Sequence, residues 1–542
     1  MNLSLDFALF MVIIITINRR TVMAYQVHQL NKKTGITYVY EAVSVWDKEL
    51  KQARNKQVCV GKIDPLTDAF VPSKRLDPNQ AIHRDPAVTA SAQVVGPTIV
   101  LDTIAERTGL RSIMKSVFSE SYQELMAMAC YLVSQGGALS LCSSWAKSHM
   151  PDLAASLSSQ RISELLATVS TGQKQTFFAK WLKKRLENDY LCYDITSVSS
   201  YSEQNEYIKY GYNRDDEPLP QLNLAMLFGQ KSGLPVYYHR IPGNINDVLT
   251  LHNLIATFKA LEAGRFHYVM DKGFYSRKNI DDLVAHRAHF TISVPLNNRW
   301  VQLAIDEVHT SIHGPEGYRK LDDETLYVHS RLYPWGEGKR RCYLHLYYNA
   351  GNHARAVDAF NEALFQYRQE IESGHPVPAH QKAYEEFLIV KTTPKRGMKV
   401  YFNTETINRH ISRYSGFQAL LSSGIKDPIE AMQVYRDKDS VEKCFDDLKN
   451  SLDMKRLRMH SSSTVDGRLF VQFIALILVS ALRKQMRNTG LIEQYTVREM
   501  LREMETLTKV NYSGKYGHIM TELTKHQRQI LTSLEIPIPG AA

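Results

Sequence analysis

Three carboxylates in this sequence have the types and positions that metal-dependent chemistry needs. Asp194 interrupts the apolar run "YLCYDITSV", Asp271 ends the apolar run "FHYVMD", and Glu442 lies in a segment of helical periodicity. In a strand, the apolar neighbours of Asp194 turn to one face and the carboxylate to the other. Three hard oxygen ligands without His or Cys suit Mg²⁺, or Mn²⁺ in its place. Two such ions can activate a hydroxyl nucleophile and stabilise the leaving oxygen of a phosphodiester displacement.

A polar stripe surrounds Glu442 in the stretch "YRDKDSVEKCFDDLKN". The preceding "KDPIEAM" supplies a helix start, with Asp427 as the N-cap. On a continuous helix, four polar residues of the stretch share an arc of roughly 60°: Tyr435, Lys438, Glu442 and Lys449. The pattern predicts one metal ligand and three groups that hold DNA phosphates. The alternative is a solvated helix face with i,i+4 charge pairs.

The elements between these residues must bring them together. From residue 190 to 295 the apolar runs and helical periodicities follow the order strand, strand, strand, helix, strand, helix, strand. Asp194 lies in the first strand, Asp271 ends the fourth, and Asp247 is expected to cap the first helix. If the first and fourth strands are neighbours and the Glu442 helix crosses them, the three carboxylates converge at one sheet edge. The expected fold class is α/β.

The composition favours a globular protein with a polyanionic partner. The chain has 542 residues, a net charge of +10 and 44% hydrophobic residues, and its pI is near 9.0. Its six cysteines show no C-x-x-C and no Cys/His ligand spacing, which predicts a reducing cytoplasm and no structural zinc. The apolar run from Leu469 to Leu482 lies between Arg468 and Arg483, so we predict a buried helix and no membrane partner.

Domain boundaries are expected where the periodicity changes. Alternating and β-branched residues predict a β module and linker at 23–98, and helical periodicity predicts a DNA-binding helical domain at 99–188. A purely structural helical domain is the alternative for 99–188. The remaining segments are the first part of the core at 189–297, an inserted β-rich domain at 298–426, the helix of the third acid with a buried helix at 427–488, and a C-terminal helical region at 489–542.

Residues 1–22 contain the apolar run "FALFMVIIITINRR", which is too short to span a bilayer and lacks a basic leading region. We expect this segment to come from a start codon assigned too early, with Met23 opening the protein. A signal or anchor is the alternative.

The three acids and the spacing of the stripe resemble a known enzyme family. The pattern Tyr435-x2-Lys438-x3-Glu442-x6-Lys449 is similar to the Y-x2-R-x3-E-x6-K signature of the DDE transposases of the IS4 type. The stretches "GYNRDDEPLPQLNLAMLFG", "IPGNINDVLTL", "MDKGFYS" and "RLRMHSSSTVDGRLFVQFIALIL" resemble the IS1634 branch more narrowly. The resemblance extends from the N-terminal β module to beyond residue 480.

The resemblance implies a fold and an activity. It implies an RNase H-like catalytic core, interrupted by a β-rich insertion, in which Asp194, Asp271 and Glu442 hold Mg²⁺. It implies cleavage of double-stranded DNA at the terminal inverted repeats of an insertion sequence, and transfer of the 3′ ends to target DNA. A homodimer that pairs two element ends, in the nucleoid-containing cytoplasm of a prokaryote, is implied as well.

Two features qualify the resemblance. Lys438 stands where the family has arginine, which keeps the charge but removes the fork that binds phosphate bidentately. Related enzymes with an inserted β domain pass through a DNA hairpin, and Trp300 or Trp335 of the insertion could stack on a flipped base. Ordinary packing of both rings is the alternative.

Two other functions are compatible with parts of the sequence. A metal-dependent DNA nuclease without strand transfer needs the same three acids. A non-catalytic DNA-binding remnant needs none of them, and the presence of all three acids in a full-length core argues against it.

Overall fold

The computed structural model describes residues 13–17, 20–47, 52–73, 90–185, 190–201, 205–260, 266–394, 397–457, 461–513 and 517–539. The chain forms two compact units. The first contains residues 1–90 and 512–517, and the second contains residues 91–511 and 518–542.

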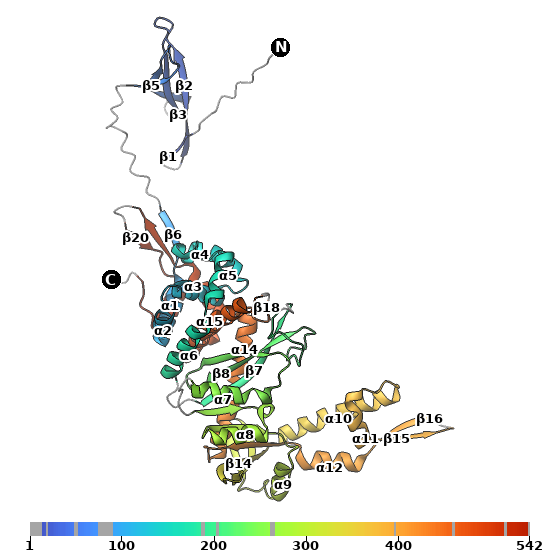
Figure 1. Ribbon diagram of the computed structural model, residues 1–542. Helices are drawn as coiled ribbons and strands as arrows, with labels where there is room; N and C mark the ends of the chain where they lie inside the picture. Colours follow the sequence, from blue (N-terminus) through green and yellow to red (C-terminus); the bar gives the residue numbers. More distant parts are fainter. Residues whose placement is uncertain are drawn as a thin grey trace. The chain divides into compact units, whose positions relative to one another are not determined.

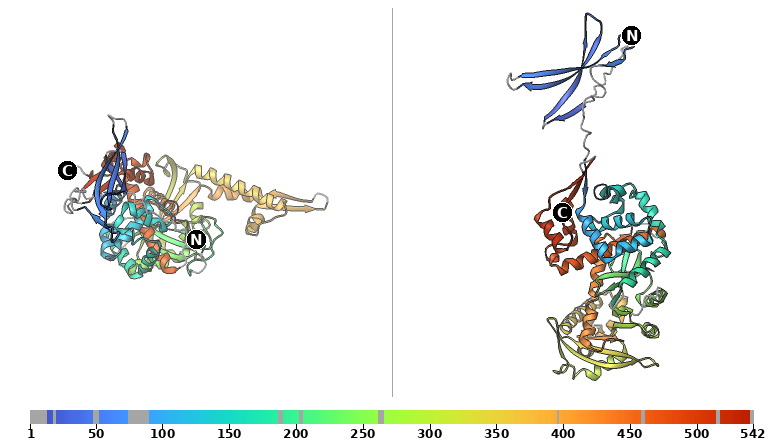
Figure 2. Two further views of the ribbon diagram at one scale, coloured as in Figure 1. Left: turned by 90° about the horizontal axis from the view of Figure 1, so that it is seen from above. Right: turned by 90° about the vertical axis from the view of Figure 1, so that its left-hand side faces the viewer.

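The first unit is an antiparallel sheet in which the strands follow in chain order (Figure 2). Its strands are β1 (Ile13–Ile17), β2 (Arg20–Leu30), β3 (Thr37–Asp47), β4 (Gln52–Ile63) and β5 (Phe70–Pro72). Two of its described apolar side chains, Val39 and Ala42, are buried. Of the segment 1–22, the described residues 13–17 form β1 and residues 20–22 begin β2, so these residues take part in the sheet. The expectation about the start codon stays a prediction.

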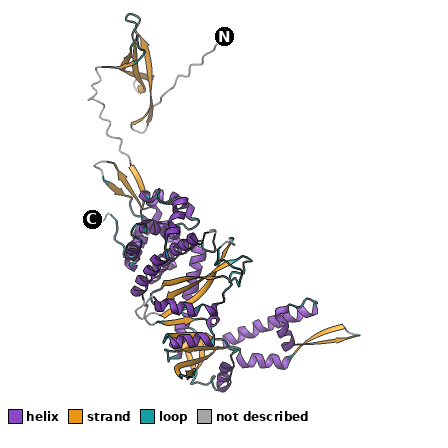
Figure 3. Cartoon of the chain, viewed as in Figure 1, coloured by secondary structure: helices purple, strands orange, loops and turns teal. Residues whose placement is uncertain are grey.

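A ten-stranded sheet dominates the described part of the second unit (Figure 3). Along the sheet the order is β12-β13-β14-β17-β11-β10-β7-β8-β9, and β18 pairs with the end of β7. The strands are β7 (Tyr190–Ser200), β8 (Gln221–Gly229), β9 (Leu234–Pro242), β10 (His267–Met270), β11 (His289–Val294), β12 (Tyr318–Leu321), β13 (Glu324–Trp335), β14 (Arg340–Tyr348), β17 (Phe417–Ser422) and β18 (Arg456–Leu457). The sheet together with its helices confirms the predicted α/β class.

The direction of the strands changes at the centre of this sheet. β7 pairs antiparallel with β8, and β8 pairs antiparallel with β9. β10 pairs parallel with β7 on one side and with β11 on the other. The parallel pairs require crossovers, which contain α7 (Leu251–Ala260) and α8 (Arg277–Ala285). Every residue of β8 is buried, as its nearly continuous apolar sequence "QLNLAMLFG" predicts.

A layer of helices covers one end of this sheet. The N-terminal helices are α1 (Gly96–Thr108), α2 (Leu110–Val117), α3 (Tyr122–Ser134), α4 (Cys142–His149), α5 (Ser159–Thr168) and α6 (Thr171–Arg185). They pack around α15 (Ser462–Asn488), which also contacts β9. Phe177 of α6 meets Phe470 of α15 edge to face, with ring centroids 5.1 Å apart. Sheet and helices therefore share one hydrophobic core.

α15 is long and apolar enough to span a membrane, but 89% of its most apolar 18-residue stretch is buried inside the protein. It is the central helix of the core, which confirms the burial predicted for Leu469 to Leu482. The C-terminal part adds α16 (Val497–Glu503), α17 (Lys525–Ser533), and the strands β19 (Thr508–Tyr512) and β20 (His518–Met520), which form a small sheet with β6 (Ala90–Val94).

The segment 298–426, predicted to be an inserted β-rich domain, has two parts, and its assignment as a domain stays a prediction. Because β14 pairs with β17 and β17 pairs with β11, the strands of this segment extend the central sheet. The part that leaves the sheet is a largely helical arm with small hydrophobic clusters of its own (Figure 1). It consists of α10 (Ala350–Glu372), α11 (Gln381–Phe387), the hairpin β15 (Leu388–Thr393) and β16 (Gly397–Phe402), and α12 (Thr404–Tyr414). Before β12, α9 (Arg299–Val308) leads out of β11.

The predicted continuous helix of the polar stripe is corrected. Asp427 caps its start, as predicted, by accepting from the backbone N–H groups of Ile429 and Glu430. The helix is nevertheless broken into α13 (Pro428–Arg436), α14 (Asp439–Asp446) and a π-helical turn (Asp447–Ser451). Lys438 lies in the break and Lys449 in the π-helical turn, so the single 100° periodicity does not relate the four residues of the stripe.

A close helix crossing gives the first testable prediction. A Cβ atom on Gly467 of α15 would lie 2.1 Å from the backbone oxygen of Leu166 in α5. We expect Gly467→Ala to force the two helices apart and to lower the free energy of unfolding by about 1 to 3 kcal/mol. Urea unfolding followed by tryptophan fluorescence measures the loss.

Gly172→Ala is the matched control, because a Cβ atom on this helical glycine meets open space. It should leave stability unchanged or raise it by up to about 1 kcal/mol, since alanine is the better helix former. Equal stability of the two variants would contradict the crossing described above.

Candidate active site

The pairing of β10 with β7 puts two of the predicted acids side by side. The last pair of this parallel ladder joins Met270 to Tyr193. Asp194 is the next residue of β7, and Asp271 follows the end of β10 in extended backbone. Paired residues of adjacent strands turn their side chains to the same face. The first and fourth strands of the sequence pattern are therefore neighbours, and both carboxylates stand at the point where β10 ends.

Short hydrogen bonds fix each carboxylate. Asp194 Oδ1 accepts from the backbone N–H of Ile195 at 2.8 Å. Burial raises the pKa of Asp194 to about 6, against the lowering effect of that hydrogen bond and of the nearby Lys438 charge. Asp271 begins a short 3₁₀ turn, and its Oδ1 accepts from the backbone N–H of Lys272 at 2.7 Å.

Tyr435 supplies the second donor to Asp271. Its hydroxyl donates to Asp271 Oδ1 at 2.6 Å from α13. The ring is buried, and burial together with the Asp271 charge raises the pKa of Tyr435 well above its usual range. The hydroxyl therefore stays protonated and orients the carboxylate. This placement differs from the predicted contact with a DNA phosphate.

The Lys438 ammonium lies among the three acids. Its Nζ donates to Glu442 Oε1 at 3.2 Å. Burial lowers the pKa of Lys438, but the charges of Asp271, Glu442 and Asp194 outweigh burial and the net shift is upward. The Lys438 side chain is 18% exposed, whereas that of Glu442 is 62% exposed. The Lys438 ammonium thus balances part of the charge of the acids, and the exposed Glu442 side chain has room to change its orientation.

The described residues include no group of three His, Cys, Asp or Glu side chains placed to hold a metal ion. Asp194 and Asp271 offer hard oxygen donors from adjacent strands, which fits a divalent cation. Glu442 is instead turned to Lys438 and would have to release it in order to serve as a third ligand.

Two ion pairs fasten the loop between β7 and β8 beside the acids. Arg214 donates through one nitrogen to both carboxylate oxygens of Asp247, at 2.5 and 2.6 Å. The next residue, Asp215, accepts from Lys449 Nζ at 2.7 Å on both oxygens. The Lys449 side chain is only 12% exposed, so its ammonium is engaged with Asp215 and not with solvent.

Sequence reasoning missed the part that Arg214, Asp215 and Asp247 take in this site. Asp247 was expected to cap a helix, but its carboxylate pairs with Arg214 and lies near Gly273, two residues after Asp271. Its charge raises the pKa of Asp194. The only signal in the sequence was the density of charges in "GYNRDDEPLP", which does not show which partner each charge takes.

Residues 187–478, more than half of the chain, match the family model described as the transposase DDE domain. The chain belongs to this family. All three predicted acids lie within the matched residues.

No curated protein matches this DDE transposase. Among solved structures it is similar to the piggyBac transposase synaptic complex with hairpin DNA. The TM-score is 0.33 and the identity 11%, over 70% of this chain and 64% of that chain. Similarity at this level supports no argument about the fold or the reaction.

Trp300 and Trp335, either of which could stack on a flipped base, belong to one aromatic cluster with ring centroids 5.9 Å apart. Trp335 is buried, and its indole N–H donates to Asp281 Oδ1 at 2.7 Å. Trp300 donates to the hydroxyl of Tyr275 at 3.0 Å, and its ring lies 4.7 Å from that of Tyr333. Ordinary packing accounts for Trp335, and the partly exposed Trp300 is the better placed of the two for a ligand.

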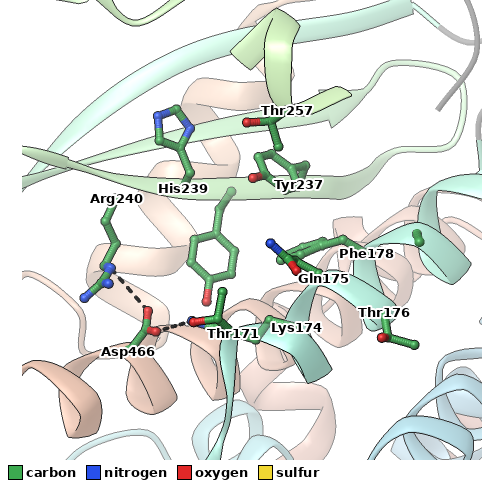
Figure 4. A pocket seen from close by; sticks show the side chains of 12 residues that line it. Thr171, Lys174, Gln175, Thr176, Phe178, Tyr237, His239, Arg240, Thr257 and Asp466 are labelled. Carbon is green, nitrogen blue, oxygen red and sulfur yellow. Dashed lines mark hydrogen bonds and ion pairs between the residues drawn. The ribbon is translucent and has the colours of Figure 1, made fainter. Parts of the chain in front are cut away.

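A cleft of about 610 Å³ lies apart from the acids, where α6, β9 and the start of α15 meet (Figure 4). Asp466 pairs there with both Lys174 and Arg240. The Arg240 guanidinium also stacks on the Tyr207 ring at 4.2 Å. The two cations are therefore engaged with the protein, and we assign no catalytic part to this cleft.

The Lys449–Asp215 pair gives the second prediction. In a double-mutant cycle of Lys449→Met and Asp215→Asn, we expect a coupling of about 1 to 3 kcal/mol in the free energy of unfolding. The reason is that either single change leaves a partly buried charge without its partner.

The control cycle uses Arg161 and Glu164 on α5, whose side chains are 66% and 46% exposed. Its coupling should stay below about 0.5 kcal/mol. If both cycles gave the same small value, Lys449 would be a solvated charge, free to bind DNA.

Proposed function

We propose that this DDE transposase serves an insertion sequence of the IS4 type, in its IS1634 branch. It binds the terminal inverted repeats in double-stranded DNA, cleaves at the element ends and transfers the 3′ ends to target DNA. The observation that carries the proposal is the adjacency of Asp194 and Asp271 at the end of β10, with Lys438 and Glu442 facing them. The spacing of the stripe and the quoted sequence motifs support the narrower branch.

The proposed core fold is RNase H-like. Its support is the strand order β9-β8-β7-β10-β11, with antiparallel pairs up to β7 and parallel pairs after it. This order puts the middle of β7, the first strand, beside the end of β10, the fourth strand. That edge is where an open α/β sheet has room for a ligand.

Divalent metal dependence, with Mg²⁺ as the ion, is part of the proposal. Asp194, Asp271 and Glu442 are the residues that would hold it, and hard oxygen donors support that choice. A bound divalent ion supplies activation of a water or 3′-hydroxyl and stabilisation of the leaving oxygen.

The other residues of the site act through position and charge. Tyr435 and the backbone N–H of Lys272 hold the Asp271 carboxylate in one orientation. Lys438 balances the acids in the free protein, and we assign it to a phosphate next to the scissile bond as a point charge. Tyr435 and Lys449 are engaged with Asp271 and Asp215, so the phosphate contact rests on Lys438.

Several wider features rest on the family resemblance. A homodimer would pair two element ends, and the site of action would be the nucleoid in the cytoplasm. Trp300 remains the candidate for stacking on a flipped base. Within the helical region, α3 is an unsuitable recognition helix because Leu125 through Ser134 are all buried. The exposed basic end of α6 is the better candidate for contact with DNA.

The third prediction tests the acids. Asp194→Asn, Asp271→Asn and Glu442→Gln should each reduce strand cleavage by roughly a thousandfold or more, because several kcal/mol of barrier lowering depend on the ionised carboxylates. Binding of element ends should stay nearly unchanged. Gel assays on labelled ends measure both quantities.

Asp216→Asn is the control, because Asp216 is an exposed acid on the same loop with a positive φ that asparagine also adopts. It should cleave at the wild-type rate. Equal loss of binding and cleavage in the three variants would count against the assignment. Nicks without joined products in the wild type would favour the nuclease alternative.

A further inference from the structure

The loop between β7 and β8 displays two exposed tyrosine rings a few residues before Arg214 and Asp215. Tyr210 is 65% exposed and Tyr212 is 77% exposed. Among the described residues neither ring meets another aromatic ring or a cation, unlike most tyrosines of this unit. Large exposed aromatic rings mark interaction surfaces, because their burial against a partner is strongly favourable.

The backbone beneath these rings is rigidly held. Lys209 and Gln221 exchange two backbone hydrogen bonds of 2.9 Å, and the buried Gln221 side chain donates to the Tyr212 carbonyl at 2.6 Å. A Cβ atom on Gly211 would lie 2.1 Å from the Gly243 oxygen. Only glycine allows that approach, so the chain between the two tyrosines is pressed against the core.

The same loop is continuous with the active site. Asn213 follows Tyr212 and donates to Ser199 Oγ at 3.1 Å on β7. The next two residues are Arg214 and Asp215, which pair with groups beside the acids. Two residues of extended chain span at most about 7 Å, so Tyr212 stands within one nucleotide step of Arg214.

The loop carries exposed charges of both signs, with Lys209 directly before Tyr210 and the acids Glu206 and Asp216 before and after the two tyrosines. Lys209 is exposed and makes no ion pair among the described residues. Glu217 is shared by Arg456 and Lys455, and the hydrogen bond from Arg456 lowers the pKa of Glu217 to about 2. The group of Glu217, Lys455 and Arg456 therefore carries two positive charges and one negative charge near neutral pH.

We propose that Tyr210 and Tyr212 are a stacking platform for unpaired bases of the DNA strand that leaves the active site. This inference rests on the proposed function, since it takes DNA to be the substrate. Every base presents a flat π face, so stacking on tyrosine tolerates any sequence. Paired bases inside a duplex cannot reach the rings, and the platform therefore selects frayed or cleaved ends over intact duplex.

The experiment measures DNA binding by the full chain in EDTA, so that cleavage plays no part. Fluorescence anisotropy is recorded with a short single strand of mixed sequence, with the same strand built from abasic sites, and with the corresponding duplex. Tyr210→Ala and Tyr212→Ala should each weaken binding of the base-bearing strand about tenfold. Tyr210→Phe and Tyr212→Phe should bind as the wild type does, because the ring remains.

Two comparisons separate stacking from a general defect. The wild type should bind the abasic strand as weakly as the double variant Tyr210→Ala/Tyr212→Ala binds the normal strand, and removing the bases should cost that double variant little more. Tyr318→Ala is the matched control, since Tyr318 is 43% exposed on β12 at the opposite edge of the same sheet. It should bind all three DNAs normally.

The outcomes are distinguishable. If the wild type bound no DNA of any kind, the proposed function itself would be wrong. If it bound DNA but the alanine variants matched Tyr318→Ala, only the platform would be overturned. A change in self-association of the tyrosine variants, with DNA binding intact, would assign the surface to a protein partner and overturn the platform as well.

Discussion

Asp194 and Asp271 stand where β10 ends beside β7, and burial disfavours the ionised form of Asp194. The rest of the site is arranged around these two acids, because burying an ionised carboxylate without partners costs several kcal/mol. The backbone N–H groups of Ile195 and Lys272 and the hydroxyl of Tyr435 offset part of this cost. The Lys438 ammonium offsets more, because it faces Asp194, Asp271 and Glu442 together. The site is thus built to hold positive charge between its acids.

The segment from α13 to the π-helical turn supplies two of the groups that face the acids. Tyr435 lies one residue before the end of α13, and Lys438 lies between α13 and α14 in a helical backbone conformation. Asp427 fixes the start of α13 through two backbone donors. On the far side of α14, Arg483 pairs with the buried Asp447, which anchors the π-helical turn that carries Lys449. Each end of the broken helix is therefore held by a charge.

The sequence was informative where local patterns decide the structure. The apolar runs predicted β7, β8 and β10, and the caps and periodicity predicted the start of α13 and the buried α15. It was uninformative where partners are distant in the chain. Nothing local indicates that β14 pairs with β17 and that β17 pairs with β11, so that these strands join the central sheet. The stretch around Lys438 contains no Pro or Gly, so nothing in the sequence indicates the break between α13 and α14. The partners of Lys449 and Asp247 are Asp215 and Arg214, which belong to the loop between β7 and β8 and are distant in the chain.

The loop from Lys209 to Asp215 shows how this fold couples substrate contact to catalytic geometry. Adjacent residues of the loop, Arg214 and Asp215, pair with groups on different segments, Asp247 before α7 and Lys449 after α14. A displacement of the loop would therefore disturb the charges around Asp194 from two directions. Because the tyrosines are displayed from backbone that is already fixed, a strand that bound there, as we propose, would cost little ordering entropy. The pairs of Arg214 and Asp215 hold this loop beside the acids, and the same fixed backbone would then present the tyrosines to the DNA.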